Sequence, residues 1–300
     1  MRELRCPICG EERRAVVYRS TLPPEAETSG RRPVDPLAVH FRINRCAGCG
    51  LIYSSPILDD NGARALYQEA SHTNVPGGEE DNVRRTFAGY YNLARPHVAR
   101  RDRILDIGCD VGVLLNIARQ DGFRELHGVE PNPMAAERAR AVAGSVISSE
   151  FYEAIPYPPD HFDLVTLIHV VDHLVDVNRV LTKVFRELKP GGVVVSVVHN
   201  VESLLARVLG ERFPPFNAYH NYFFSKRTLA DLFRRRGFEP IASVSTRNVY
   251  SFGFLAQRAP LPGGIRRPFE ALVSSVGLGR VPLSLSLGNI GLAARKPANS

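Results

Sequence analysis

The chain has 300 residues, of which 44% are apolar, and a formal net charge of +7. This composition suits one large globular domain or two smaller ones, and the short, scattered groups of arginines do not indicate nucleic-acid binding. No apolar run reaches membrane-spanning length, and residues 1–6 lack the apolar segment of a secretory signal. We therefore expect a cytoplasmic protein.

Four of the five cysteines form two Cys-x-x-Cys-Gly knuckles, Cys6 with Cys9 and Cys46 with Cys49. Two thiolates three residues apart can converge on one metal ion, and the following glycine permits the tight turn. The two knuckles together predict a closed, structural Zn²⁺ site in a zinc-ribbon module over residues 1–56. Two disulfides are the alternative, which the missing secretory signal disfavours.

The next stretch, 57–95, is expected to be a helical linker or lid. Residues 59–61 can cap a helix that ends near residue 68, and a second helix is expected over 83–93. The polar segment 72–81 between them contains Pro-Gly-Gly and is typical of a loop.

Strands and helices alternate in the remaining domain, 96–300. Strands are expected at 104–107, 126–129, 145–147, 162–168, 193–198, 241–244 and 290–294, and helices at 113–120, 134–142, 177–188 and after Ser225. This alternation predicts an α/β fold: a parallel, Rossmann-like sheet of seven strands with helices on both faces. In such sheets ligands bind at the carboxyl ends of the strands.

Polar residues mark these strand ends. The first strand ends at Asp106 and runs into a turn containing Gly108 and Gly112, where backbone N–H groups can face a ligand. Glu130 ends the second strand, where its carboxylate can accept hydrogen bonds from hydroxyl groups. Cys109 lies within the glycine turn and is not a predicted zinc ligand.

Several motifs then carry a family resemblance. Residues 105–112 (LDIGCDVG), 128–131 (GVEP), 162–166 (FDLVT) and 188–192 (LKPGG) resemble, in this order, the signature of class I S-adenosylmethionine-dependent methyltransferases. The knuckles and the histidine-containing stretches 169–176 and 220–225 are similar to a bacterial zinc-ribbon subgroup acting on sugars, glycans and natural products. The resemblance spans Cys6 to Pro297 and implies S-adenosyl-L-methionine as cofactor.

The resemblance also implies a cofactor site. Gly108 would lie against the cofactor, Asp106 would hold its amino-acid end through the turn, and Glu130 would bind both ribose hydroxyls. Asn132 or Met134 would flank the adenine on one side. The full set of expected cofactor residues is Asp106, Gly108, Cys109, Asp110, Gly112, Glu130, Pro131, Asn132, Glu150, Phe151 and His169.

One residue departs from the family pattern. Asp110 replaces the middle glycine of the turn, and aspartate tolerates left-handed backbone better than most residues. Its carboxylate could bind the ammonium group of the cofactor's methionine part or repel the carboxylate there. A non-catalytic, cofactor-binding paralogue is therefore one alternative function.

The reaction implied by the resemblance needs alignment and, for an oxygen nucleophile, a base. His173 is the first candidate and His169 the second, with Asp172 or Asp176 as the carboxylate that orients the imidazole. A divalent metal held by His169, Asp172 and His173 is the alternative. Structural roles for the two histidines are also open.

The acceptor site is expected beneath an aromatic insert near 202–222, with His199, His220 and Tyr222 as candidate substrate residues. A second insert near 259–287 is basic and apolar, and it either docks on the fold or approaches a membrane. The predicted function is O-methylation of a hydroxyl on a sugar, glycan or glycosylated natural product, with RNA modification as the alternative. The acceptor's identity and the oligomeric state cannot be predicted from these residues.

Overall fold

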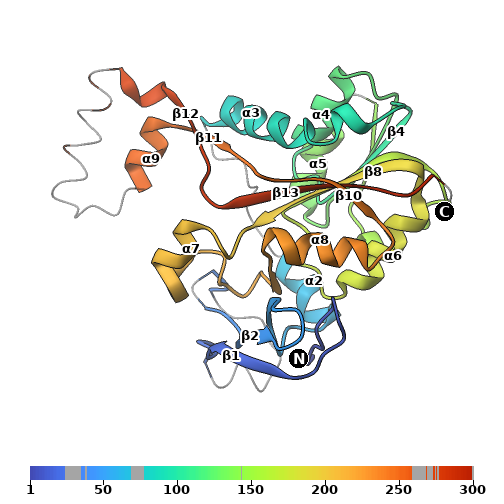
Figure 1. The fold of residues 1–300 in the computed structure, drawn as a ribbon. Helices are drawn as coiled ribbons and strands as arrows, with labels where there is room; N and C mark the ends of the chain where they lie inside the picture. Colours follow the sequence, from blue (N-terminus) through green and yellow to red (C-terminus); the bar gives the residue numbers. More distant parts are fainter. Residues whose placement is uncertain are drawn as a thin grey trace.

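The computed structural model describes residues 1–23, 35–37, 39–68, 78–142, 144–258, 268, 273, 275 and 277–298 (Figure 1). The central sheet has the strand order β10-β13-β8-β7-β4-β5-β6, which confirms the predicted Rossmann-like α/β fold. Its strands are β4 (Arg103–Ile107), β5 (Glu125–Val129), β6 (Ser145–Ser148), β7 (Phe162–Ile168), β8 (Leu188–His199), β10 (Glu239–Ser245) and β13 (Asn289–Arg295).

The sheet is not parallel throughout, which corrects the prediction at one strand. β13 runs antiparallel to both of its neighbours, β8 and β10, whereas the pairs from β8 to β6 are parallel. The N–H of Thr246, just after β10, donates to the carbonyl of Asn289 at the start of β13 (3.0 Å). The chain therefore re-enters the sheet at the end it has just left, and an antiparallel return needs no crossover helix.

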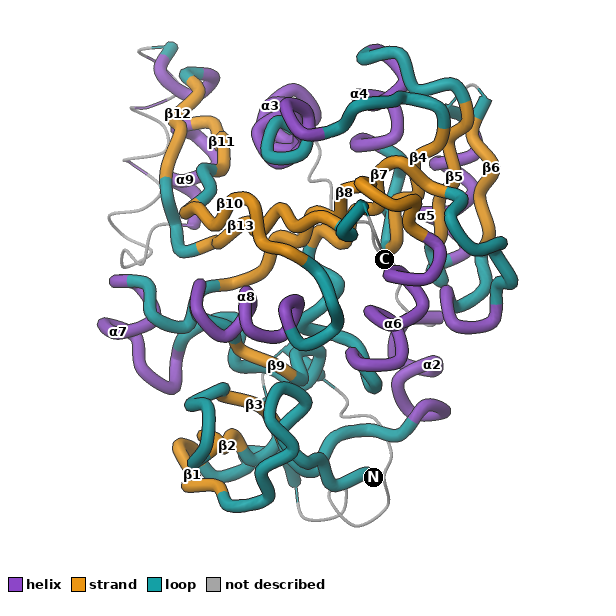
Figure 2. Tube along the Cα trace, turned by 45° about the vertical axis from the view of Figure 1, so that its right-hand side comes forward, coloured by secondary structure: helices purple, strands orange, loops and turns teal. Residues whose placement is uncertain are grey.

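Helices cover both faces of the sheet (Figures 1 and 2). Strand residues alternate between two apolar clusters, so that Ile104 faces one and Leu105 the other. The first cluster includes α3 (Glu80–Tyr91), α4 (Val113–Gln120) and α5 (Pro133–Arg140), and the second includes α6 (Val177–Glu187) and α8 (Lys226–Arg234). Burial on both faces explains why β7 and β8 are so rich in apolar residues.

The N-terminal segment forms a separate small sheet that extends into the larger domain. Its strands β1 (Arg14–Tyr18), β2 (Ile43–Cys46) and β3 (Ile52–Ser54) are joined by β9 (Tyr222–Phe223), which pairs with β3. The buried side chains of Cys6 and Tyr53 belong to the same cluster as Phe233 of α8. The N-terminal segment is thus packed directly on the domain that carries the central sheet, and β9 was not predicted.

The remaining elements lie outside the central sheet. They are α2 (Asp60–Gln68), α7 (Leu204–Leu209), β11 (Asn248–Ser251), α9 (Phe252–Arg258), β12 (Pro282–Leu285) and the short 3₁₀ helices η1 (Arg95–His97), η2 (Tyr152–Ala154), η3 (Gly210–Arg212) and η4 (Leu278–Arg280). β12 pairs with β11, whereas most of the predicted insert near 259–287 and residues 72–77 of the predicted linker lie outside the described residues. None of the described helices is long and apolar enough to span a bilayer.

Candidate cofactor and acceptor site

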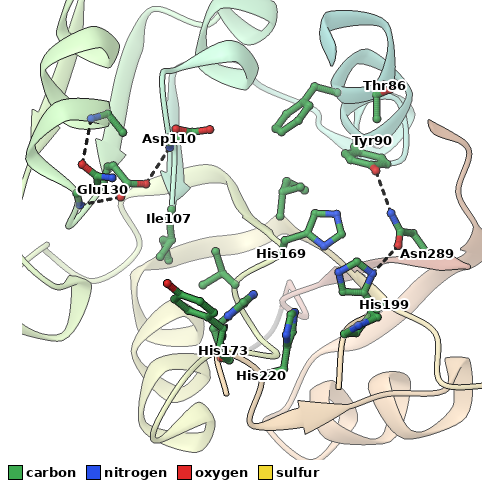
Figure 3. A pocket seen from close by; sticks show the side chains of 18 of the residues that line it. Thr86, Tyr90, Ile107, Asp110, Glu130, His169, His173, His199, His220 and Asn289 are labelled. Carbon is green, nitrogen blue, oxygen red and sulfur yellow. Dashed lines mark hydrogen bonds between the residues drawn. The ribbon is translucent and has the colours of Figure 1, made fainter. Parts of the chain in front are cut away.

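A single cavity of about 700 Å³ opens at the carboxyl ends of β4, β5, β7 and β8. Seven of the predicted cofactor residues line it: Gly108, Asp110, Glu130, Pro131, Asn132, Phe151 and His169. The other four, Asp106, Cys109, Gly112 and Glu150, are described but lie outside this lining. The four histidines His169, His173, His199 and His220 line the other part of the same cavity (Figure 3).

Glu130 organises the turn after β4. Its Oε2 accepts the N–H of Asp110 (3.0 Å), and its Oε1 accepts the N–H of Asn132 (2.8 Å). Asp110 has a φ of 45°, so it adopts the left-handed conformation expected for a replaced glycine. Gly108 has a φ of 74°, and a Cβ there would lie 2.5 Å from a methyl carbon of Val170. Only glycine therefore fits at position 108.

Three carboxylates lie near one another beside the turn after β4: those of Asp110 and Glu130, which line the cavity, and that of Asp106, which lies behind the lining. Asp106 is buried and accepts a hydrogen bond from the hydroxyl of Thr166 (2.6 Å). Burial raises the pKa of Asp106 to about 7, and the nearby charges of Glu130 and Asp110 act in the same direction. Burial also raises the pKa of Glu130. The concentration of acidic groups favours a ligand that carries positive charge at this end.

The region expected to hold an adenine ring lies beside α5. The side chain of Asn132 accepts the N–H of Met134 (3.0 Å) and so caps the start of that helix. Asn132 also lines the cavity. Met134 is 57% exposed and Glu150 is exposed, and neither lines the cavity. Phe151 does line it, and the guanidinium of Arg64 lies 4.4 Å from the centre of its ring.

The histidines gather around one buried carboxylate. The ring centres of His169 and His199 are 4.8 Å apart, and those of His173 and His220 are 4.2 Å apart. Asp172 is 1% exposed, with its carboxylate oxygens 3.8 Å from Nε2 of His173 and 3.7 Å from Nε2 of His220. The predicted catalytic residues are thus brought together, and His199 and His220 join them.

The orientation of two of these rings is fixed from outside the cluster. Nδ1 of His173 lies 2.9 Å from the carbonyl oxygen of Tyr219 and must carry the proton to donate to it. Nδ1 of His220 lies 3.0 Å from Oδ1 of Asn217, an oxygen that also accepts the N–H of Tyr219 (2.9 Å). In the neutral rings, Nε2 therefore carries the lone pair.

A chain of hydrogen bonds that the sequence did not indicate orients His199. Its Nδ1 donates to Oδ1 of Asn289 (2.9 Å), and the amide of Asn289 donates to the hydroxyl of Tyr90 (3.3 Å) (Figure 3). The hydroxyl of Tyr90 in turn donates to Asn248 (2.9 Å). All four residues line the cavity. Tyr90 lies on α3 and Asn248 on β11, far in sequence from the motifs.

Burial keeps the imidazoles neutral. It lowers the pKa of His173 to about 4, that of His169 and His220 well below the usual range, and that of His199 in the same direction. Burial raises the pKa of Asp172 to about 6. Close to neutral pH, the cluster therefore presents lone pairs rather than imidazolium N–H groups.

Tyr222, the third predicted substrate residue, does not reach the cavity. Its ring is 2% exposed within the apolar cluster beneath the sheet, and its hydroxyl donates to the carbonyl of Val175 (3.3 Å). The aromatic insert contributes Phe213, Pro214 and Tyr219 to the cavity instead.

The four knuckle cysteines converge as predicted. Their Sγ atoms lie within 4.8 Å of one another, with Cys6–Cys49 and Cys9–Cys46 separations of 3.4 Å. Gly10 and Gly50 have φ angles of 74° and 77° in the two turns. Tetrahedral zinc with bonds of about 2.3 Å places thiolates about 3.8 Å apart, so the four thiols fit this ion. The cluster suggests zinc, which itself stays a prediction.

The profile of a protein family described as "Methyltransferase domain" matches residues 78–243, which covers the cavity's strand ends. The chain belongs to this methyltransferase family. Its expected cofactor is accordingly S-adenosylmethionine.

Relatives of this methyltransferase differ in what they modify. A "Probable S-adenosylmethionine-dependent methyltransferase" of Mycolicibacterium smegmatis is 28% identical over 60% of this chain and 68% of its own. A ubiquinone biosynthesis O-methyltransferase of Bradyrhizobium diazoefficiens is 29% identical over 37% of this chain and 46% of its own. The chain thus spans less than half of that second relative. Others of similar identity are named C- and N-methyltransferases.

Solved structures agree on the fold. A methyltransferase of Thermotoga maritima described as SAM-dependent superposes with a TM-score of 0.50, covering 72% of this chain and 90% of that one at 19% sequence identity. At this identity the likeness extends to the architecture alone.

Replacing Glu130 with Ala in this methyltransferase should weaken cofactor binding. The change removes a carboxylate that both holds the turn and faces the cavity, and hydrogen bonds to charged groups contribute about 1.5–3 kcal/mol each. We expect the dissociation constant for S-adenosylhomocysteine to rise about 10- to 100-fold in calorimetry. Glu150→Ala, which removes an exposed carboxylate outside the cavity, is the control and should change it less than about twofold. Equal effects would contradict the assignment of Glu130.

Replacing Asp110 with Gly should stabilise the protein. A left-handed conformation costs most residues about 1–2 kcal/mol, and glycine avoids this cost. We expect the melting temperature without cofactor to rise by about 2–4 °C. Asp110→Ala removes the same charge but keeps a Cβ, so it should show no such gain. An equal change in both variants would assign the effect to charge rather than to the backbone.

Proposed function

We propose that this methyltransferase transfers a methyl group from S-adenosylmethionine to a hydroxyl oxygen of a small-molecule or glycan acceptor. The observation that carries the proposal is the continuous cavity, which has carboxylates at one end and neutral histidines at the other. A cationic cofactor suits the first end, and an O–H group suits the second.

The acidic end offers groups for each part of the cofactor. When bound, S-adenosylmethionine supplies a methyl group on a positively charged sulfur. Glu130 would accept the two ribose hydroxyls, because each carboxylate oxygen accepts one backbone N–H and can accept a second hydrogen bond. Asp110 would face the methionine part and attract its ammonium group. Phe151 and Asn132 would flank the adenine.

At the histidine end the chain must align the acceptor and take its proton. As the O–C bond forms and the S–C bond breaks, the hydroxyl proton has to leave the acceptor oxygen. With no other group bound at the cluster, Nε2 of His173 would accept it, because Nδ1 already donates to Tyr219. His169 is the second candidate, and Asp172 would stabilise the imidazolium that forms.

The walls of the acceptor end favour a ring-shaped molecule. Tyr90, Phe213, Pro214, Tyr219 and Tyr250 line this part of the cavity. Aromatic faces suit the apolar faces of sugar rings, whereas neighbouring amides such as Asn248 and Asn289 suit their hydroxyls. We therefore propose a sugar, a glycan or a glycosylated natural product as the acceptor class, with the zinc ribbon in a structural role.

Methyl transfer from labelled S-adenosylmethionine tests this function. Purified protein is incubated with small-molecule and glycan extracts or with RNA, and products are analysed by mass spectrometry for the gain of one methylene unit at oxygen. Label in a glycan or small molecule at oxygen is the expected result. Label in RNA, or at carbon or nitrogen, would overturn the proposed acceptor, and cofactor binding without any transfer would favour the non-catalytic alternative.

A further inference from the structure

We infer that Asp172, His173 and His220 form a second metal centre, which binds one divalent transition-metal ion at the acceptor end of the cavity. The inference deepens the proposed function, but metal binding can be measured without it. The three ligand atoms lie within 4.8 Å of one another, as do those of Asp172, His169 and His199 on the same carboxylate. The structure thus regroups the predicted triad of His169, Asp172 and His173 into two triads that share Asp172.

The first argument is the state of the Asp172 carboxylate. It is 1% exposed, and neither of its oxygens has a well-formed hydrogen bond in the described part of the chain, although the backbone N–H groups of Asp172 and His199 lie close enough to stabilise its charge weakly. Burying a carboxylate without a partner is costly, which is why such groups in proteins are normally paired or coordinate metals. A metal cation bound between Asp172 and the histidines would balance the negative charge of this carboxylate.

The second argument is the tautomer of the two nearest rings. Tyr219 and Asn217 require protons on Nδ1 of His173 and His220, so each neutral ring directs a lone pair from Nε2. These nitrogens are 3.8 and 3.7 Å from oxygens of Asp172. Such distances are too long for hydrogen bonds, and a cation placed between the two ring nitrogens and the carboxylate would be attracted by all three groups.

The surroundings resemble those of known metal sites in their chemistry. Metal-binding imidazoles usually donate their second N–H to a carbonyl or carboxylate, which fixes the ring and its tautomer. His173, His220 and His199 all do so here, toward Tyr219, Asn217 and Asn289.

The donor set selects the kind of ion. Imidazole and carboxylate together suit zinc, iron, cobalt or manganese better than magnesium or calcium, which prefer oxygen. Three protein ligands leave at least one coordination position of the metal open. Because His173 and His220 line the cavity, this open position would face the space where the acceptor binds. An acceptor hydroxyl bound there would lose its proton more readily. His173 would then act as a ligand rather than as the base.

The test is cobalt binding to purified, zinc-loaded protein without cofactor or acceptor. We expect one Co²⁺ per chain beyond the knuckle site, with visible absorption but without thiolate-to-metal charge transfer, or a second metal equivalent already present after purification. Asp172→Asn should weaken this binding at least about 100-fold, and His220→Gln should weaken it as well. Asp176→Asn, which keeps a good helix cap, should bind as the wild type does.

Two results of the cobalt experiment would overturn the metal centre. No metal beyond the knuckle site in the wild type, or unchanged cobalt binding by Asp172→Asn, would overturn the inference. Thermal unfolding and S-adenosylhomocysteine binding establish that each variant is folded. Because the readout needs no acceptor, a wrong acceptor class would leave it intact. Methyl transfer by protein that keeps its knuckle zinc but lacks the second metal would overturn the role of this metal in the reaction.

Discussion

The double substitution Cys46→Ser with Cys49→Ser should remove one zinc equivalent per chain and destabilise the protein by several kcal/mol. Zinc contributes about 10–16 kcal/mol to small metal domains, and the sheet here is short and closed by two knuckles. We expect a fall in melting temperature of about 10 °C, measured by thermal unfolding with metal analysis. Cys109→Ala is the matched control and should keep its zinc, because Cys109 lies in the turn after β4, outside the four-cysteine cluster.

The same substitution should also impair methyl transfer, because the N-terminal sheet holds the segment that carries His220, a residue of the proposed acceptor site. Ser54 of β3 donates its N–H to the carbonyl of Asn221 (2.8 Å) and its hydroxyl to that of His220 (3.2 Å). Loss of the small sheet would release the segment that carries His220. A double variant with unchanged zinc content and melting temperature would refute a structural zinc site.

The central sheet could be predicted because its local signals agree. All seven residues of β7 are buried, and the run Phe162–Ile168 is apolar enough to be recognised without context. Helix starts were equally local: Asn132 caps α5, and Ser225 accepts the N–H of Thr228 at the start of α8. Such features depend on a few neighbouring residues, which the sequence displays directly.

The parts of the site that were missed depend on contacts between distant segments. Tyr90 and Asn289 are 199 positions apart, and neither follows a strand whose end could be recognised as part of the site. Tyr222 was expected in the acceptor site because of its aromatic neighbours, yet pairing of β9 with β3 turns it into the core. A two-residue strand has no periodicity, so its pairing with another strand alone determines where its side chains pack.

The predicted histidines are a mixed case. His169, Asp172 and His173 were recognised from their place after a buried strand, and the structure does bring them together. Their grouping could not be predicted from the sequence. His220 belongs to a segment that is hydrogen-bonded to the N-terminal sheet, and the ring of His199 is oriented by Asn289 of β13 and Tyr90 of α3. Only the folded structure shows that the carboxylate of Asp172 lies within 4.8 Å of nitrogen atoms from four imidazole rings.

Replacing His173 with Ala should lower turnover by about 10²- to 10⁴-fold while leaving cofactor affinity within about threefold. The size follows from the loss of a positioned group that removes the acceptor's proton, whether as a base or as a metal ligand. The affinity is spared because the acidic turn around Glu130 lies at the other end of the cavity. Initial rates and calorimetry with S-adenosylhomocysteine measure the two effects separately.

His161→Ala provides the control, because it removes an imidazole outside the cavity lining and should keep full turnover. Unchanged turnover in His173→Ala would exclude this residue from the chemistry and leave His169 as the remaining candidate base. A parallel loss of cofactor affinity would instead mean that the substitution disturbs the whole cavity. The separation of turnover from affinity thus distinguishes a role in proton removal from a role in folding the segment after β7.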